Sequence, residues 1–371
     1  MTQRSTIYEV AQRSGVSTAT VSRVMHNASG YSAATRDRVL AIAAELGWLP
    51  NGSARSLARR RAGIVGLLFP DLDSGGDAED QAPLYVDQVI RGAERAATEV
   101  GQAVLIAATR GPSGHDLAVS IASKVDGLVV VAHSLSEPEI AALGSRLPVV
   151  VLSDRAGRRT NLDSVGVDNR GGMRELVDHL LVFHGYRDLA FVAGPRRSPD
   201  STERFAAFRQ AMRAAAVPCP TEPHAVGDFT QAGGARAVDR LLADREPPQA
   251  IVCGNDEMAV GALDVLTRLR LRVPGDVAIT GFDDLSVARR MRPPLTTVAQ
   301  PMREIGAAAV RAVLARLAEP AAARTSAVLP TRLAVRRSCG CPPARPISRS
   351  QRTRPPQPAG PAPKGRTHAW Q

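Results

Sequence analysis

From Ala62 onward, short apolar runs alternate with longer amphipathic segments, and this alternation restricts the fold more than any other feature of the chain. Such a pattern is typical of parallel strands joined by crossover helices. The predicted strands are 64–69, 103–107, 127–131, 149–152, 164–167, 189–192, 250–253 and 277–281, and the predicted helices are 86–100, 171–183, 202–216, 233–243, 257–269 and 303–318. Because these units exceed one doubly wound sheet, we expect an α/β body with two Rossmann-like lobes.

Three short helical segments precede this body. Thr6 and Glu9 have the spacing of a capping box, and Gly15 is placed to end the first helix. Ser17 and Ser32 are placed to cap the second and third helices. The residues expected to face inward are Ile7, Val10, Ala11, Val21, Val24, Val39, Ile42, Ala43 and Leu46. Three short helices with a tight turn predict a helix-turn-helix headpiece over residues 1–50.

The net charge of +11 is concentrated at the two ends of the chain. Residues 1–61 hold nine arginines and three acidic residues, and residues 336–371 hold eight basic residues and no acidic one. Residues 62–335 are therefore mildly acidic. A preference for arginine codons would explain the excess of arginine over lysine, but it does not explain the clustering. The distribution indicates a nucleic-acid-binding head on a sensor body.

Two segments lack the apolar residues that a core needs. Residues 51–61 are small, polar and basic, which is typical of a linker or of a helix that forms only under some conditions. Residues 338–371 are rich in Pro, Arg, Ser and Gln, which predicts a disordered tail. The predicted domains are thus 1–50, 51–61, 62–337 and 338–371.

Cysteines and histidines do not form a recognisable motif. The cysteines lack the C-x2-C spacing of zinc sites and are too few for a disulfide framework; they are Cys219, Cys253, Cys339 and Cys341. The histidines are dispersed, and neither a G-x-S-x-G elbow nor a P-loop is present. We expect no metal, no cofactor and no enzyme. Without an apolar leader or a run of about eighteen apolar residues, we expect a cytoplasmic protein with no membrane partner.

The residues resemble those of the lactose and galactose repressor family (LacI/GalR). The strongest match is TIYEVAQRSGVSTATVSRVMH at 6–26 followed by SAATRDRVLAIAAELGWLPN at 32–51. It continues through VDGLVVV, VGVDNRGG, FVAGP, NDEMAVGAL, GFDD and PPLTTV, so it covers about residues 5–337. The resemblance implies a sequence-specific transcription regulator, with repression the favoured role. Its two-lobed body would resemble periplasmic sugar-binding proteins and hold a small effector, for which a sugar or sugar derivative is the favoured class.

In this family the second helix of the headpiece enters the major groove. Arg23 would form a bidentate contact with guanine, and Thr18 and Ala19 fall at the family's two specificity positions. Without the surrounding motif, Arg23 would read as a solvated surface residue. The residues expected to contact phosphates are Thr6, Ser17, Thr20 and Ser32, near helix N-termini. Ser22, on the solvent side of the second helix, is also expected at the DNA.

The linker resembles the family's hinge helix. In that reading two hinge helices meet over the minor groove, Leu57 is the wedge inserted at the central base step, and Ala54 is the small residue that allows the helices to come close. Asn51, at the start of the linker, is also expected at the DNA. The alternative is that Leu57 packs on the body. Since a half-site contact is weak alone, we expect a homodimer on a pseudo-palindromic operator in double-stranded DNA.

The resemblance also places an effector pocket between the lobes. The residues it implies are Tyr85, Arg204, Phe229, Asn255 and Asp283. Each polar one has a structural alternative: an ion pair with Glu203 for Arg204, a helix N-cap for Asn255 and a loop cap for Asp283. Residues 71–88 depart from the family pattern, and either Ser153 or Asp154 faces the cleft. Two other functions remain open: a DNA-binding protein without ligand control and a sugar receptor outside transcription.

Overall fold

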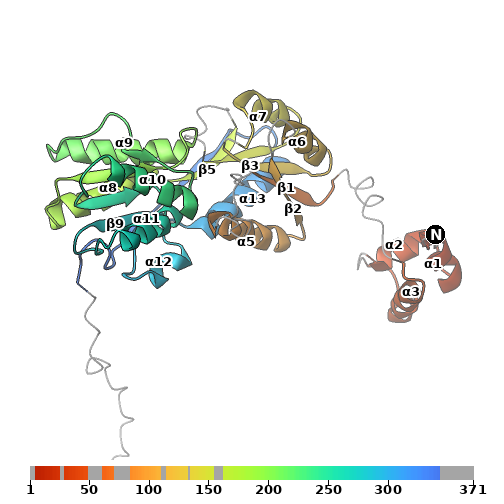
Figure 1. Ribbon diagram of the computed structural model, residues 1–371. Helices are drawn as coiled ribbons and strands as arrows, with labels where there is room; N and C mark the ends of the chain where they lie inside the picture. The colour runs from red at the N-terminus through yellow and green to blue at the C-terminus, as the bar shows by residue number, and fades with distance from the viewer. Residues whose placement is uncertain are drawn as a thin grey trace, which may run out of the picture.

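The computed structural model describes residues 5–25, 29–48, 61–70, 84–109, 114–132, 134–153 and 162–342. The headpiece contains the helices α1 (Ile7–Ser14), α2 (Thr18–Met25) and α3 (Ala33–Glu45) (Figure 1). The predicted capping box opens α1, where the Thr6 N–H donates to Glu9 Oε2 over 2.8 Å. Gly15 ends the helix in the left-handed conformation, with φ 67°. All the residues predicted to face inward lie in or against one small core.

The first lobe of the body is a six-stranded sheet in the order β11-β5-β4-β3-β1-β2, and all its pairings are parallel. Its strands are β1 (Ile64–Pro70), β2 (Ala103–Thr109), β3 (Gly127–Val131), β4 (Val149–Leu152), β5 (Asp163–Val167) and β11 (Ser326–Leu329). Two separate apolar clusters lie on the two faces of this sheet. One face is covered by α5 (Leu84–Thr98) and α13 (Met302–Ala318), the other by α6 (Gly114–Ala122) and α7 (Glu137–Gly144).

The second lobe repeats this plan with the order β12-β10-β9-β8-β6-β7, in which only β12 is antiparallel to its neighbour. Its strands are β6 (Leu189–Ala193), β7 (Ala225–Val226), β8 (Ala250–Cys253), β9 (Ala278–Asp283), β10 (Thr296–Ala299) and β12 (Arg332–Ala334). One face packs against α8 (Asn169–Asp178), its π-helical continuation η2 (His179–Phe183) and α9 (Pro199–Ala214). The other packs against α10 (Gln231–Ala243) and α11 (Asp256–Arg268), and α12 (Ser286–Arg290) lies beside α11.

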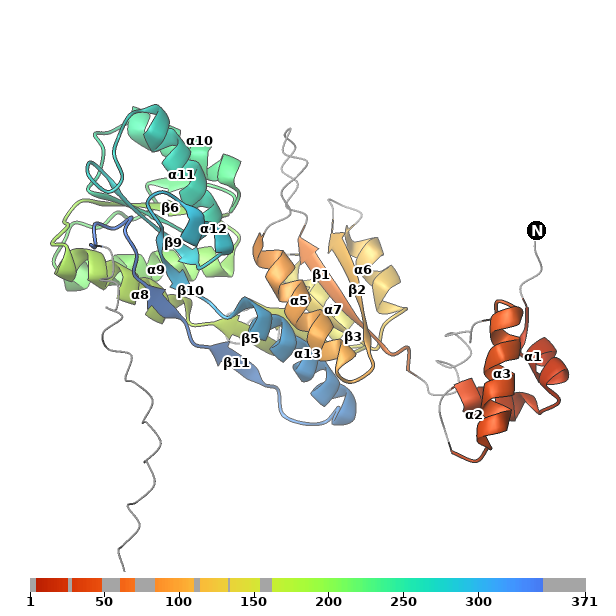
Figure 2. The ribbon, with the colours of Figure 1, turned by 90° about the horizontal axis from the view of Figure 1, so that it is seen from below.

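The described chain passes between the lobes after β5, after β10 and after β11. Figure 2 shows these connections running from one lobe to the other. The central strands are continuous apolar runs because helices cover both faces of each sheet; all five residues of β3 are buried, for example. The predicted α/β class with a three-helix headpiece and a two-lobed body is therefore confirmed.

The packed body extends beyond the predicted boundary at residue 337. Ser338 and Cys339 are buried, and the Ser338 hydroxyl donates to the Ile279 carbonyl oxygen over 2.6 Å. The same hydroxyl oxygen accepts the Thr296 N–H over 2.8 Å. The prediction that disorder begins at 338 was therefore wrong for residues 338–342, because polar bonds rather than an apolar pattern hold them. Residues 343–371 lie outside the described part of the chain.

Among the described residues, no helix has the length and apolar character needed to cross a lipid bilayer.

Candidate effector-binding site and DNA-binding face

A cavity lies between the two lobes, at the carboxyl ends of strands from both sheets. All five residues predicted to bind an effector line it. Among the described residues, its lining consists of Phe69, Pro70, Tyr85, Val86, Val131, Ser153, Ser198, Asp200, Arg204, Phe229, Asn255, Glu257, Asp283 and Gln300. Aromatic and aliphatic side chains are thus combined with a few convergent polar groups, as in sites for small polar ligands.

Arg204 projects from α9 into this cavity and is only 3% exposed. Its Nε donates to Asn169 Oδ1 and its Nη1 to the Gly254 carbonyl oxygen, both over 2.8 Å. The guanidinium carbon lies 3.7 Å from the centroid of the Phe282 ring. Arg204 therefore does not lie on a solvated helix face paired with Glu203. A guanidinium has five N–H groups, so it can hold these partners and still donate to a ligand.

The Asp283–Asp284 doublet divides its two carboxylates between different tasks. Asp283 is buried in the cavity, where its Oδ1 accepts the Gln300 amide over 2.5 Å. Asp284 instead pairs with Arg336 over 2.5 Å and with Arg289 over 2.8 Å. Both aspartates have positive φ, 123° and 56°, a backbone strain that is concentrated at functional sites. Asp284 thus fixes the loop, and Asp283 faces the cleft.

Burial is the main influence on the Asp283 carboxyl. It raises the pKa of Asp283 well above the ordinary aspartate range, although Arg204 and Gln300 favour the charged form. The nearby Asp200 raises the pKa further. A ligand hydroxyl that donates to this carboxylate would reverse part of the cost of its burial.

Asn255 has a structural role and also lines the cavity. As the N-cap of α11, its Oδ1 accepts the Met258 N–H over 2.9 Å. Its Nδ2 donates to the Phe229 carbonyl oxygen over 2.9 Å. Phe229 has φ 70°, and its ring packs so closely on Gly194 that a Cβ there would lie 2.1 Å from the ring. The amide therefore fixes both the start of α11 and the aromatic wall of the pocket.

The first-lobe wall contains Tyr85 and Ser153. Burial and the carboxylates of Asp200 and Asp283 raise the pKa of the Tyr85 phenol well above its usual range. Ser153, one of the two residues expected to face the cleft, lines the cavity with φ 60°. Asp154 lies outside the described residues, as do residues 71–83 of the segment that departs from the family pattern.

Glu257 is a cavity residue that the sequence reasoning missed. Its Oε1 accepts the Leu84 N–H over 3.0 Å, so this bond joins α11 of the second lobe to α5 of the first. Burial raises the pKa of Glu257 to about 7, against the effect of the Leu84 bond. Acidic residues are common in the first turn of a helix, where they interact favourably with the helix dipole. The sequence therefore gives no sign that Glu257 also binds the other lobe. Asp200, Ser198 and Gln300 were missed as well.

The headpiece presents the start of α2 at its surface. Ser17 caps this helix, since its Oγ accepts the Thr20 N–H over 3.2 Å. Arg23 and Ala19 are exposed and Thr18 is half-buried, whereas the opposite side of the helix is buried in the core. Thr20 and Ser22 are half-buried. The exposed side chains are thus free of the headpiece core.

Thr6 and Ser32, also predicted at the DNA, are exposed residues at helix N-termini. Thr6 caps α1, and Ser32 caps α3 by accepting the Thr35 N–H over 3.2 Å. Such positions direct backbone N–H groups toward an anion. The hinge residues Asn51, Ala54 and Leu57 lie outside the described residues.

Family models match both parts of the chain. Residues 6–51 match the model for bacterial regulatory proteins of the lacI family, and residues 177–339 match the periplasmic binding protein-like domain. The chain is 32% identical over 317 residues to the HTH-type transcriptional repressor CytR of Escherichia coli K12, covering 84% of this chain and 89% of that protein. It is 30% identical over 337 residues to catabolite control protein A of Priestia megaterium, covering 90% and 98%. Identity to the ribose operon repressor of E. coli K12 is 32% over 321 residues, covering 85% and 94%.

Solved structures resemble the whole architecture. The lac repressor dimer bound to operator and the anti-inducer ONPF aligns with a TM-score of 0.78 at 28% identity, covering 91% of this chain and 99% of that one. The complex of the transcriptional regulator CelR with cellobiose aligns with a TM-score of 0.68 at 30% identity, covering 90% and 100%.

A helix-turn-helix headpiece joined to a two-lobed body with a polar cleft defines a ligand-responsive, DNA-binding transcription regulator. The identities to full-length repressors are high enough, and extend far enough along the chain, to be more specific. The chain belongs to the lacI family of bacterial regulatory proteins.

Proposed function

We propose that this protein is a repressor that binds a pseudo-palindromic operator as a homodimer and releases or tightens its hold when a sugar or sugar-like effector enters the cleft. The observation that carries the proposal is the convergence of Arg204, Asn255 and Asp283 on one cavity between the lobes. A guanidinium, an amide and a carboxylate supply both donors and acceptors, which a polyhydroxylated ligand requires. Phe229 and Tyr85 add aromatic surface for the apolar face of such a ligand.

The relatives support this choice of ligand class. The structural relative CelR holds cellobiose, and one of the sequence relatives is named a ribose operon repressor. In this chain, the five pocket residues then bind the hydroxyl groups and the ring of a sugar in the cleft between the lobes. Catalysis has no part in this function, since the operator and the effector are both bound reversibly.

At the operator, α2 lies in the major groove and Arg23 reads a guanine edge. Ala19 contacts a base through its methyl group, and the capping hydroxyls of Thr6, Ser17 and Ser32 lie near phosphates. The lac repressor relative binds its operator as a dimer. Two copies of this chain bind two half-sites in the same way. They act in the cytoplasm.

The effector acts by changing the relative position of the lobes. Each ligand must favour one arrangement, because equal affinity for both would leave DNA binding unchanged. The hydrogen bond between Leu84 and Glu257 joins the two walls of the cleft. A ligand bound beside it therefore affects how closely the two lobes approach each other. The first lobe begins at β1, directly after the linker from the headpiece, and its movement alters how the two linkers meet at the DNA.

The direct test is selection of random duplex DNA by the purified full chain at near-physiological salt. We expect enrichment of a twofold-symmetric site. Arg23→Ala should lose discrimination at one base pair of each half-site, worth about 1–3 kcal/mol. Arg38→Ala, another exposed headpiece arginine, should keep the same consensus. Sequence-independent binding by the wild type, with and without a sugar mixture, would contradict the proposal.

A further inference from the structure

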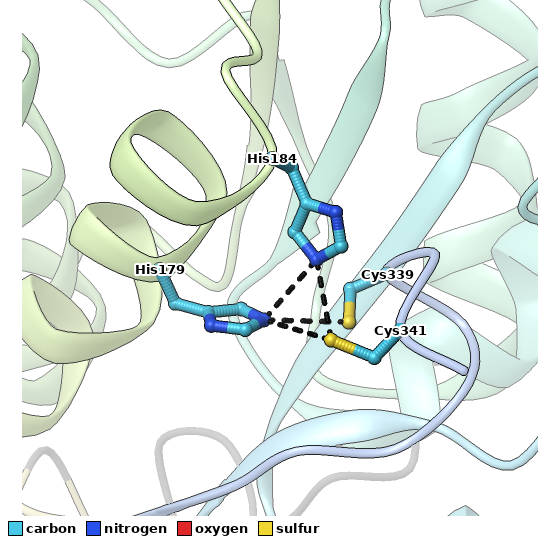
Figure 3. Close-up of side chains that lie close together, drawn as sticks. All are labelled: His179, His184, Cys339 and Cys341. Carbon is cyan, nitrogen blue, oxygen red and sulfur yellow. Dashed lines mark hydrogen bonds between the residues drawn. The ribbon is translucent and has the colours of Figure 1, made fainter. Parts of the chain in front are cut away.

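Two histidines and two cysteines meet in the second lobe, at the edge opposite the cleft (Figure 3). His179 begins η2 and His184 directly follows it, whereas Cys339 and Cys341 lie on the segment after β12. Their ligand atoms all lie within 4.8 Å of one another. The expectation that these residues are dispersed was therefore wrong, because the C-terminal segment folds back onto η2.

Four of the six distances between the ligand atoms match those of a metal coordination shell, and the other two are no longer than 4.8 Å. His179 Nε2 lies 3.3 Å from His184 Nε2, and it lies 3.5 Å from the Sγ atoms of both Cys339 and Cys341. Cys341 Sγ is 3.4 Å from His184 Nε2. Around a tetrahedral zinc ion, metal–ligand lengths of about 2.0–2.1 Å for nitrogen and 2.3 Å for sulfur give edges of about 3.4 Å for N–N and 3.6 Å for S–N. The four side chains are thus already positioned to bind one ion.

We propose that His179, His184, Cys339 and Cys341 bind one Zn²⁺ in a structural site. Two imidazoles and two thiolates form a Cys2His2 set, which is typical of closed, four-coordinate zinc sites. The donor atoms contain no oxygen, which disfavours Ca²⁺ and Mg²⁺. All four cysteines of the chain are free thiols, so no disulfide competes for the two sulfur atoms.

Local backbone geometry builds each half of the site from two residues that are close in sequence. The wider π-helical turn of η2 brings His179 and His184 together although they are five residues apart. Gly340, with φ 103°, reverses the chain between Cys339 and Cys341. A Cβ at Gly340 would lie 3.1 Å from Tyr186 Oη and 3.4 Å from His184 Cε1, so the close approach favours glycine.

Neighbouring residues form hydrogen bonds and ring contacts with the ligands and thereby orient them. The Thr296 hydroxyl donates to Cys339 Sγ over 3.1 Å and so fixes the position of this buried side chain. Tyr186 donates its hydroxyl to the Cys339 carbonyl oxygen over 3.1 Å and stacks on the His184 ring. Both contacts hold the C-terminal segment against the lobe.

The place of the cluster at one end of the second sheet indicates a structural role for the metal. Thr296, beside the cluster, begins β10, and Gln300, in the cleft, follows the other end of this strand. The metal is thus separated from the effector by the length of a strand. Zinc bound to the four side chains joins the segment after β12 to the end of α8. It stabilises the second lobe, since a ligand that binds only the folded state raises the stability of that state.

The experiment uses the full chain, purified without a metal-affinity tag, stripped with a chelator and then titrated with ZnCl2. We expect one zinc per chain by elemental mass spectrometry and a rise of several degrees in the unfolding temperature on adding zinc. Co²⁺ in place of zinc should give the visible bands of a tetrahedral ion and a thiolate charge-transfer band in the near ultraviolet.

Matched variants separate this site from adventitious binding. Cys341→Ser and His184→Gln change ligands that are not fully buried, so the fold is expected to survive, which circular dichroism checks. Each should weaken zinc binding more than about 100-fold, which exceeds the loss typical when a residue that only orients a ligand is changed. Cys219→Ser, a half-buried cysteine outside the cluster, should bind zinc like the wild type. Zinc content that stays near zero in the wild type, equal zinc binding in Cys341→Ser, or a mass two units low from a Cys339–Cys341 disulfide would each overturn the proposal.

Discussion

Arg204 and Asp283 lie 3.7 Å apart in the cleft, and each side chain is only 4% exposed. An ion pair buried this deeply is costly unless its remaining hydrogen-bonding groups are satisfied. Asn169 and Gly254 accept from the arginine, and Gln300 donates to the aspartate. The pair therefore provides a fixed donor and a fixed acceptor at the place where the two lobes meet.

Replacing Asp283 by Asn should weaken effector binding with little change in shape. The amide keeps the size of the side chain but loses the charge that accepts a ligand hydroxyl, so we expect a loss of about 10-fold or more, corresponding to about 1.5–3 kcal/mol for a hydrogen bond to a charged group. Calorimetry with the sugar that gives the largest thermal shift measures this. Asp276→Asn, at a carboxylate that pairs with Arg272, is the control and should bind normally; equal affinity of both variants would contradict the role of Asp283.

Asn255→Asp should separate the two roles of this residue. A carboxylate oxygen still accepts the Met258 N–H and caps α11, but it cannot donate to the Phe229 carbonyl oxygen. We expect the free energy of unfolding to change less than in Asn255→Ala, which should lose about 1 kcal/mol from the cap. Effector affinity should fall in both variants.

Thr230→Ala is the matched control for Asn255. Thr230 caps α10 by accepting the Gly233 N–H over 2.9 Å and does not line the cleft. It should lose stability, measured by urea unfolding, and keep its effector affinity. Effector affinity that follows the loss of stability in all three variants would show that Asn255 acts only as a cap.

Glu257→Gln should remove a pH dependence of stability. Burial raises the pKa of Glu257 to about 7 from an ordinary value of 4.5, so the unfolded chain releases this proton first as pH rises. The stability that the protonated carboxyl contributes is fully present below about pH 4.5 and is lost as pH rises through about 7. The unfolding temperature of the variant, relative to the wild type, should therefore increase between about pH 5 and pH 8.

The exposed Glu246 provides the comparison for this measurement. Glu246→Gln should keep a constant difference from the wild type across the same pH range. If the unfolding temperature of Glu257→Gln also differs from that of the wild type by a constant amount, burial does not raise the pKa of Glu257.

Arg316→Met should strongly destabilise the first lobe. Arg316 binds the buried Asp163 with two bonds of 2.8 and 2.9 Å, and removing one partner of such a pair costs about 3–5 kcal/mol because the other charge stays buried. Urea unfolding measures the loss. The double variant Asp163→Asn with Arg316→Met should regain part of it. Arg311→Met, which breaks an exposed pair with Glu304, should cost no more than about 1 kcal/mol; a similar cost for Arg316 would contradict this account.

Most interior strands and the edge strand β2 could be predicted from the sequence, but the other edge strands could not. All of β3 and β4 is buried, so both are continuous apolar runs. The edge strand β11 is largely exposed and β12 spans three residues, so neither has a clear pattern. The short β7 and β10 and the helices α6, α7 and α12 were missed as well.

The residues of the site could be predicted where they lie in segments that resemble the family. Arg204, Asn255 and Asp283 followed from resemblance, and the structure brings them together. Glu257 could not be predicted, because its partner Leu84 lies in the other lobe and is brought to it only by the folding of the body. The cluster of His179 and Cys339 spans most of the second lobe in sequence, and spacing rules describe only ligands that are near in the chain.

The most direct test of control by the cleft is operator affinity measured by fluorescence anisotropy with and without the effector sugar, at fixed salt. In the wild type, we expect the sugar to change the operator dissociation constant by about 5- to 150-fold. In Asp283→Asn, a sugar concentration near the wild-type dissociation constant for the sugar should change it much less, while affinity for the operator alone is retained. An equal response of both proteins, or no response of the wild type to any sugar that stabilises it, would contradict the claim that this cleft controls DNA binding.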